Sequence, residues 1–164
     1  PRPPKGEEDE DLINAGKEPV TLLTGGSYFH HADSFGMIRG RHLDFCVLGA
    51  FQVSAAGDLA NWHTGAPDAI PAVGGAMDLA SGAKRVVIAM QHSAKGKSKV
   101  VKKCSLPLTS ARPIDLLVTE LAVIAFPCGR ATLQETAPGV SVQQVLEATE
   151  AELVVPKQVP QMAL

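Results

Sequence analysis

The sequence predicts an α/β fold: a mixed, largely parallel open sheet covered by helices on both faces. Two apolar runs, 43–55 and 85–90, are separated by a segment that can form a helix, and such a crossover joins parallel strands. Aromatic residues make up only 4% of the 164 residues, so the core must rely on aliphatic side chains. That composition suits a sheet covered by helices better than a β-sandwich.

The first elements are short. Residues 20–23, which follow Pro19, are apolar and predict a strand. A short helix comes next, because Asp33 or Ser34 can cap its start and Gly40 can end it.

The centre of the chain carries the sheet. Residues 43–55 form a nearly continuous apolar run, predicted to be one buried strand with Gly49 at its end. A short helix through Ala80 is expected after Gly74 and Gly75. The run 85–90 then predicts a second buried strand, parallel to the first.

The second half is less regular. Segments 114–126 and 132–136 are expected to be strands of a mixed or antiparallel region, and 152–155 a last strand. In the stretch SVQQVLEATE, Ser141 and Gln144 have the spacing of a capping box, which predicts a helix there.

Composition excludes several classes of function. The formal net charge is −2, so binding to nucleic acid or to an anionic membrane is not expected. No apolar run is long enough to cross a bilayer. The three cysteines are odd in number and lack CxxC spacing, so we expect no disulfide framework and a cytoplasmic location.

The usual catalytic motifs are missing. There is no GxSxG stretch and no GxGxxG or GxxxxGK[ST] phosphate loop. No metal site is expected, because the sequence has neither HExxH nor a Cys/His cluster. His30 and His31 are adjacent, so their side chains point in different directions. A lysine cluster could meet the phosphates of a nucleotide-like ligand or be a solvated loop: Lys95, Lys97, Lys99, Lys102 and Lys103. No aromatic residue alternates with these lysines, which argues against single-stranded nucleic acid.

One loop stands out, GDLANWHTGAPDAIPAVGGAMDL at 57–79. It places the only tryptophan, Trp62, among glycine, alanine and proline residues. Gly74 and Gly75 directly precede the expected helix, where free backbone N–H groups favour negative charge. The pair could be an ordinary turn, or it could act as an oxyanion hole in acyl transfer.

Three stretches carry a resemblance to a known family: GGSYFHHADSFGMIRG, HLDFCVLGAFQVSAAGDLANW and IPAVGGAMDLASGAK. In this order they closely resemble the β subunit of the family I CoA-transferases, which include the succinyl-CoA:3-ketoacid enzymes. The likeness continues upstream through DLINAGKEPVTLL and downstream through CSLPLT, so it spans most of the chain. Within the family, SYFHHADSF, GAFQVSA and NWHTG look most like the members that act on 3-oxoadipate.

The resemblance implies a ping-pong mechanism. A glutamate attacks the thioester of succinyl-CoA and becomes a glutamyl-CoA thioester, from which an acid such as 3-oxoadipate takes the CoA. In the family this glutamate lies in a Ser-Glu-Asn-Gly motif just before the position of Pro1. The motif is absent here, and Glu7, Glu8, Glu10 and Glu18 lie in other contexts, so we expect a single domain over 1–164 that lacks its N-terminal part.

The resemblance also implies site residues. Gly74 or Gly75 would offer a backbone N–H to the reacting oxygen, and Lys17 would lie near CoA. Trp62 and Pro71 would stiffen the loop around them, while Asn61 and His63 are candidates to hold the acid. No cofactor is expected, since CoA is a substrate, and the expected partner is an α subunit of similar fold, in a heterodimer or heterotetramer.

Three alternatives stay open. The acceptor could be acetoacetate or another 3-oxo acid. The missing glutamate motif would also permit a non-catalytic CoA-binding subunit. A nucleic-acid-binding module is favoured only by the lysine cluster.

Overall fold

The computed structural model describes residues 1–14, 16–68 and 72–163. The chain divides into two compact units, Pro1–Ser34 and Phe35–Leu164. In the described part of the first unit, the one pairing is an isolated bridge between Ile13 and Pro19. The strand predicted at 20–23 is wrong: Val20 and Thr21 donate single backbone hydrogen bonds to Leu12 and Pro1, and no ladder forms.

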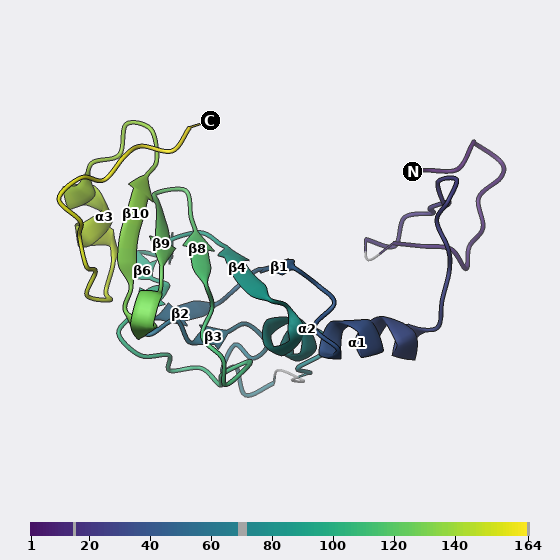
Figure 1. The fold of residues 1–164 in the computed structure, drawn as a ribbon, viewed down its shortest axis with the longest axis horizontal. Coiled ribbons are helices and arrows are strands. Elements are labelled where there is room, and N and C mark those ends of the chain that lie inside the picture. Colours follow the sequence, from purple (N-terminus) through teal and green to yellow (C-terminus); the bar gives the residue numbers. More distant parts are fainter. Residues whose placement is uncertain (15, 69–71, 164) are drawn as a thin grey trace. The chain divides into compact units, whose positions relative to one another are not determined.

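The second unit is built on a five-stranded sheet in the order β1-β4-β8-β9-β10 (Figure 1). Its strands are Phe45–Leu48 (β1), Arg85–Ala89 (β4), Leu116–Val118 (β8), Ala122–Ala125 (β9) and Thr132–Thr136 (β10). The pairs β1–β4 and β4–β8 are parallel, and β9 runs antiparallel to β8 and β10. The predicted parallel pair and the predicted antiparallel region are both confirmed.

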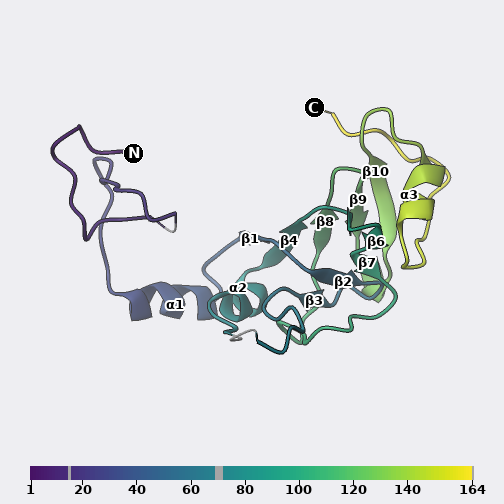
Figure 2. The same cartoon turned by 180° about the vertical axis from the view of Figure 1, so that it is seen from behind.

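A smaller sheet has the order β3-β2-β7 (Figure 2). Its strands are Gln52–Ser54 (β2), Leu59–Ala60 (β3) and Val100–Val101 (β7). Two further short strands, Ser93–Ala94 (β5) and Lys97–Ser98 (β6), form a hairpin. The single strand predicted over 43–55 is therefore wrong, because the chain leaves β1 at Gly49 and enters a different sheet as β2. The apolar run indicates that both halves of 43–55 are buried, but it does not indicate that they join different sheets.

Three α-helices lie within the described residues: His31–Arg39 (α1), Ala76–Gly82 (α2) and Val142–Ala148 (α3). The helix α1 starts before the predicted cap residues, and the His30 ring accepts a hydrogen bond from the Ala32 N–H. The predicted capping box of α3 is confirmed, since the side chains of Ser141 and Gln144 bond to each other's backbone N–H. A one-turn 3₁₀ helix covers Pro127–Gly129.

The segment predicted as a last strand, 152–155, forms only one isolated bridge, between Val154 and Thr132 of β10. It lies beside β10, but only this one residue pair is bridged, so no ladder forms. The α/β class with a mixed, largely parallel open sheet and few helices is confirmed.

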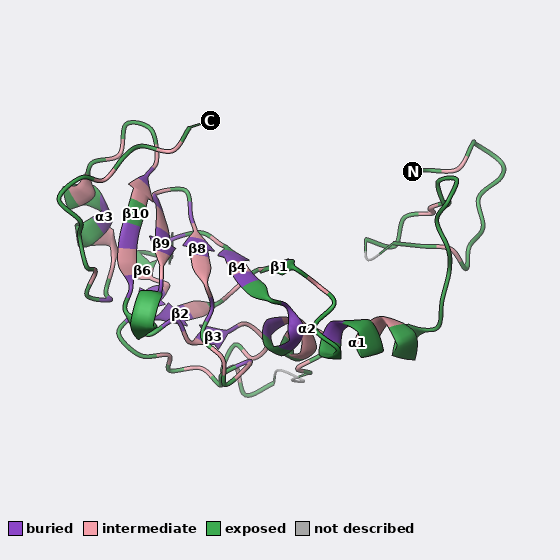
Figure 3. Cartoon of the chain, viewed as in Figure 1, coloured by how far each residue is buried: buried purple, intermediate pink, exposed green. Residues whose placement is uncertain are grey.

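Both sheets and two helices share one aliphatic core (Figure 3). Ile88, Leu117, Ile124 and Leu133 have no exposed surface, and they come from four neighbouring strands. On the other face of β1, Phe45 is 66% exposed, so the two faces of this strand differ sharply. The core packs against β1 and β4. The strand β3 and the helix α2, which border the loop of residues 61–75, also contribute side chains to it.

Candidate functional site

The loop after β3 begins at Asn61, whose side chain is already engaged. Its amide N–H donates to the Gly49 carbonyl at 3.1 Å, and its Oδ1 accepts from the Thr109 hydroxyl at 2.8 Å. The side-chain amide therefore ties the loop to two other segments. One side-chain N–H remains that can donate to a carboxylate, and acid binding by Asn61 stays a prediction.

The next two residues define how the loop is presented. The Trp62 indole N–H donates to the Leu108 carbonyl at 3.1 Å, and its ring meets the His63 ring edge to face, with centroids 5.4 Å apart. The indole thus anchors the loop, in agreement with the stiffening role predicted for it from the resemblance. Pro71, the other residue with that predicted role, lies outside the described residues.

His63 has a defined tautomer. Its Nδ1 accepts the Gly65 N–H at 2.7 Å, which requires an unprotonated Nδ1 and leaves the ring proton of the neutral form on Nε2. The residue is only half-buried. A ring presented in this way is suited to donate a hydrogen bond to a carboxylate.

The two glycines before α2 differ from each other. Gly74 has φ +57°, and a Cβ added there would meet nothing described within 4 Å. A Cβ on Gly75 would lie 3.0 Å from the Phe35 ring, so this glycine makes room for a neighbouring side chain. Of the two, Gly74 therefore has the backbone conformation and the open side that close approach of a ligand needs.

Lys17 belongs to the first unit, whereas the other four predicted residues belong to the second. It has φ +61° and closes a turn in which its N–H donates to the Asn14 carbonyl. It lines a cavity together with Arg2, Glu8 and Glu18. The predicted contact of Lys17 with CoA stays a prediction.

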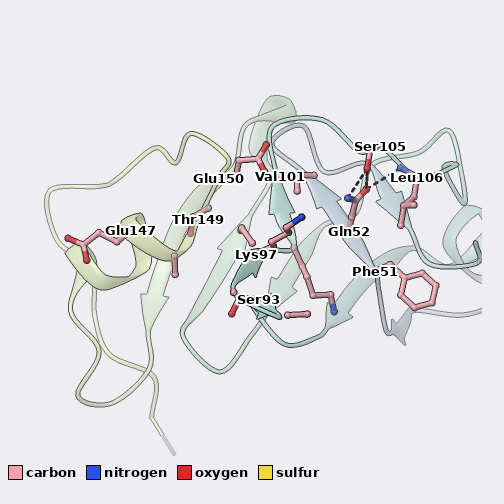
Figure 4. A pocket seen from close by; sticks show the side chains of 15 residues that line it. Phe51, Gln52, Ser93, Lys97, Val101, Ser105, Leu106, Glu147, Thr149 and Glu150 are labelled. Carbon is pink, nitrogen blue, oxygen red and sulfur yellow. Dashed lines mark hydrogen bonds between the residues drawn. The ribbon is translucent and has the colours of Figure 1, made fainter. Parts of the chain in front are cut away.

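A larger cavity, of about 690 Å³, lies between the β5–β6 hairpin and the C-terminal end of α3 (Figure 4). Its walls carry Lys97 and Lys99 but also Glu147 and Glu150, so the lysine cluster does not make this cavity uniformly basic. Burial lowers the pKa of Lys99. The lining does not include Asn61, His63, Gly74 or Gly75.

At one end of this cavity Gln52 fixes the segment after Cys104. Its side-chain oxygen accepts the N–H groups of Ser105 and Leu106 at 2.9 and 3.1 Å (Figure 4). A Cβ on Gly65 would lie 3.3 Å from Leu106, so the same segment also touches the loop that carries His63. Segment 104–110 is thus held by β2 on one side and supports the 61–65 loop on the other.

Sequence reasoning missed Thr109 and Leu108 as partners of this loop. They lie 48 and 46 residues from their partners Asn61 and Trp62, a separation at which no local pattern gives a signal. The stretch CSLPLT was singled out by resemblance alone.

Other chemistries find little support among the described residues. Within 1–14, 16–68 and 72–163, no group of three His, Cys, Asp or Glu residues could hold a metal ion. Burial raises the pKa of Cys104 to about 11 and also raises that of Cys46, so neither thiol is a ready nucleophile. In the same described residues we find no helix with the length and apolar character needed to cross a membrane.

The family described as Coenzyme A transferase matches residues 1–148. The chain is 64% identical over 125 residues to the B subunit of 3-oxoadipate CoA-transferase from Pseudomonas putida, covering 76% of this chain and 59% of that protein. It is 52% identical over 160 residues to the B subunit of a probable succinyl-CoA:3-ketoacid coenzyme A transferase from Bacillus subtilis, covering 97% and 74%. The chain thus spans a little over half the length of the Pseudomonas relative.

Solved structures share the fold at low identity. An acyl-CoA transferase apoenzyme from Escherichia coli O157:H7 gives a TM-score of 0.72 at 20% identity, covering 88% of this chain and 33% of that one. A variant of the decarboxylase AibA/AibB gives 0.71 at 23% identity, covering 85% and 59%. Because a decarboxylase has this fold as well, the family rests on the sequence match: the chain belongs to the Coenzyme A transferase family.

Proposed function

We propose that this chain is part of the B subunit of a CoA-transferase that moves CoA from succinyl-CoA to 3-oxoadipate, in the breakdown of aromatic compounds. Two relatives named as B subunits of 3-oxoadipate CoA-transferase, at 64% and 53% identity, support this choice. The enzyme includes an α subunit, and the three unpaired cysteines of this chain favour the cytoplasm.

The bend at Gly74 is the observation on which the proposal depends. Its positive φ and open side let a thioester or anhydride oxygen approach the backbone N–H groups of Gly74 and Gly75. These amides stabilise the oxyanion that forms when a glutamate carboxylate, brought by a part of the enzyme outside these residues, adds to the thioester carbonyl. The CoA thiolate leaves and then attacks the anhydride, giving glutamyl-CoA and free succinate.

His63 supplies the acid specificity in this proposal. Its Nε2–H donates to the carboxylate of 3-oxoadipate that is remote from the reacting end. Acetoacetate has no second carboxylate, so the same histidine would give it nothing to bind. This difference separates the two candidate acceptors.

A substitution in the assembled α/β enzyme tests the bend. Gly74→Ala should reduce kcat about 10²–10³-fold, the usual loss for one oxyanion donor, because a Cβ forces the bend to change. Gly139→Ala is the matched control, since Gly139 also has positive φ and open space around it but lies in the turn before α3. Equal activity of the two variants would refute the role of Gly74.

A second assay tests the acceptor. Initial rates with succinyl-CoA should be higher for 3-oxoadipate than for acetoacetate, and His63→Ala should raise the KM for the dicarboxylate acceptor alone. His42→Ala, at an exposed histidine between α1 and β1, should leave both acids unaffected.

The runner-up function is transfer to acetoacetate. It is favoured by the Bacillus subtilis relative and by the B subunit of a succinyl-CoA:3-ketoacid enzyme from Helicobacter pylori, each at 52% identity. A wild-type enzyme that prefers acetoacetate would establish it.

A further inference from the structure

The loop that carries His63 is held from one side by two consecutive residues, Leu108 and Thr109. The Leu108 carbonyl accepts the Trp62 indole N–H, and the Thr109 hydroxyl contacts Asn61 twice. Thr109 is only 3% exposed, and its own N–H donates to Leu59 of β3 at 2.7 Å. The support for the loop is therefore buried and fixed to the core.

The hydrogen atoms in this group can be assigned. The Asn61 backbone N–H donates to the Thr109 hydroxyl at 3.0 Å, so that hydroxyl uses its own proton toward Asn61 Oδ1. The amide N–H of Asn61 then faces the Gly49 carbonyl. One hydroxyl thus orients the whole side chain of Asn61 and also fixes its backbone.

We propose that Thr109 is a positioning residue for the acid substrate: through Asn61 it holds the 61–65 loop where His63 can reach the acid. The inference rests on the proposed function in one respect, that the loop binds an acid. The other part of the proposal, that Thr109 orders the loop, depends only on the hydrogen bonds described above.

Two substitutions separate the hydroxyl from the bulk of the side chain. Thr109→Val keeps the shape but removes both bonds to Asn61, while Thr109→Ser keeps the hydroxyl. In the assembled enzyme, Thr109→Val should raise the KM of the accepted acid about tenfold with a smaller change in kcat, and Thr109→Ser should match wild type. Thr136→Val is the control, because Thr136 is equally buried but lies in β10.

A second readout does not depend on activity. Trp62 is the only tryptophan in these residues, so 5-fluorotryptophan in this chain reports on the loop by ¹⁹F NMR, with Trp62→Phe to assign the signal. Thr109→Val should shift or broaden that signal, whereas Thr109→Ser and Thr136→Val should not.

The outcomes are decisive. A changed ¹⁹F signal together with a raised KM in Thr109→Val supports the proposal, and a wild-type result in either measurement overturns it. If the valine variant does not assemble, the serine variant carries the test: a wild-type KM with the hydroxyl retained supports the role, and a tenfold rise in KM overturns it. Failure of the proposed function is seen separately, as a wild-type enzyme that does not transfer CoA to 3-oxoadipate.

Discussion

The buried face of the five-stranded sheet and the 61–65 loop are held by different forces. In the sheet, Leu117 and Ile124 face the core with no exposed surface and make no side-chain hydrogen bond. In the loop, Asn61, Trp62 and His63 are only half-buried, and each is fixed by a hydrogen bond from or to its side chain. The sheet is stabilised by apolar burial, and the loop is oriented by a few polar contacts.

Because the two regions are held differently, substitutions in one should affect stability and substitutions in the other should affect function. Apolar burial does not depend on direction, so losing it lowers the free energy of unfolding without moving one particular atom. A hydrogen bond adds little net stability but sets the direction of a side chain. Substitutions in the sheet should therefore reduce stability, and those in the loop should change substrate binding.

The largest effect expected is from Leu117→Ala in β8. Leu117 is fully buried between β4 and β9, so its removal should cost about 2–5 kcal/mol in the free energy of unfolding. Urea unfolding followed by circular dichroism measures this. Leu108→Ala is the control, because Leu108 is 48% exposed and its truncation should cost far less. Equal losses of unfolding free energy in the two variants would show that burial in the sheet is not what stabilises it.

A smaller loss is expected from Gly82→Ala, where α2 meets α1. A Cβ on Gly82 would lie 2.2 Å from the Ile38 carbonyl oxygen, so backbone must move, at a cost of about 1–3 kcal/mol. Gly36→Ala, inside α1 with nothing within 4 Å, should instead stabilise by about 0.5–1 kcal/mol through helix propensity. Thermal unfolding of the two variants should show changes of opposite sign in the free energy of unfolding. Changes of the same sign would disprove the contact between Gly82 and Ile38.

Ser141→Ala tests a polar contact outside the loop. It removes the cap of α3, which should lower the free energy of unfolding by about 1 kcal/mol. Gln143→Ala, on the exposed side of the same helix, should change it by a few tenths. Urea unfolding of both variants measures the difference, and an equal effect would show that the capping box contributes nothing.

The smallest effect is expected at the surface. The Lys84 Nζ lies 2.7 Å from Oδ1 of Asp44. Its hydrogen bond and its charge hold the pKa of the Asp44 carboxyl below the ordinary value. In Lys84→Gln the pKa of Asp44 should return upward, and stability near neutral pH should barely change. An NMR titration of the Asp44 carboxyl measures the pKa, and a marked loss of stability would contradict the small contribution expected of an exposed ion pair.

Local patterns in the sequence were enough for some elements. Ser141 and Gln144 predict α3 because a capping box involves residues three apart, and the apolar run 85–90 predicts β4 because its length and residue types suffice. The strand expected at 20–23 failed since strand formation depends on a partner that the pattern does not show. Likewise, nothing in 43–55 marks that its two halves join different sheets.

Residue order alone was enough to identify the family, the α/β class and the glycine pair at the bend. The folded chain was needed to show that Gly74 is open while Gly75 faces Phe35, and that Thr109 holds Asn61. The physical reason is distance along the chain: these contacts join residues that are 40 or more positions apart, and only packing of the core brings them together.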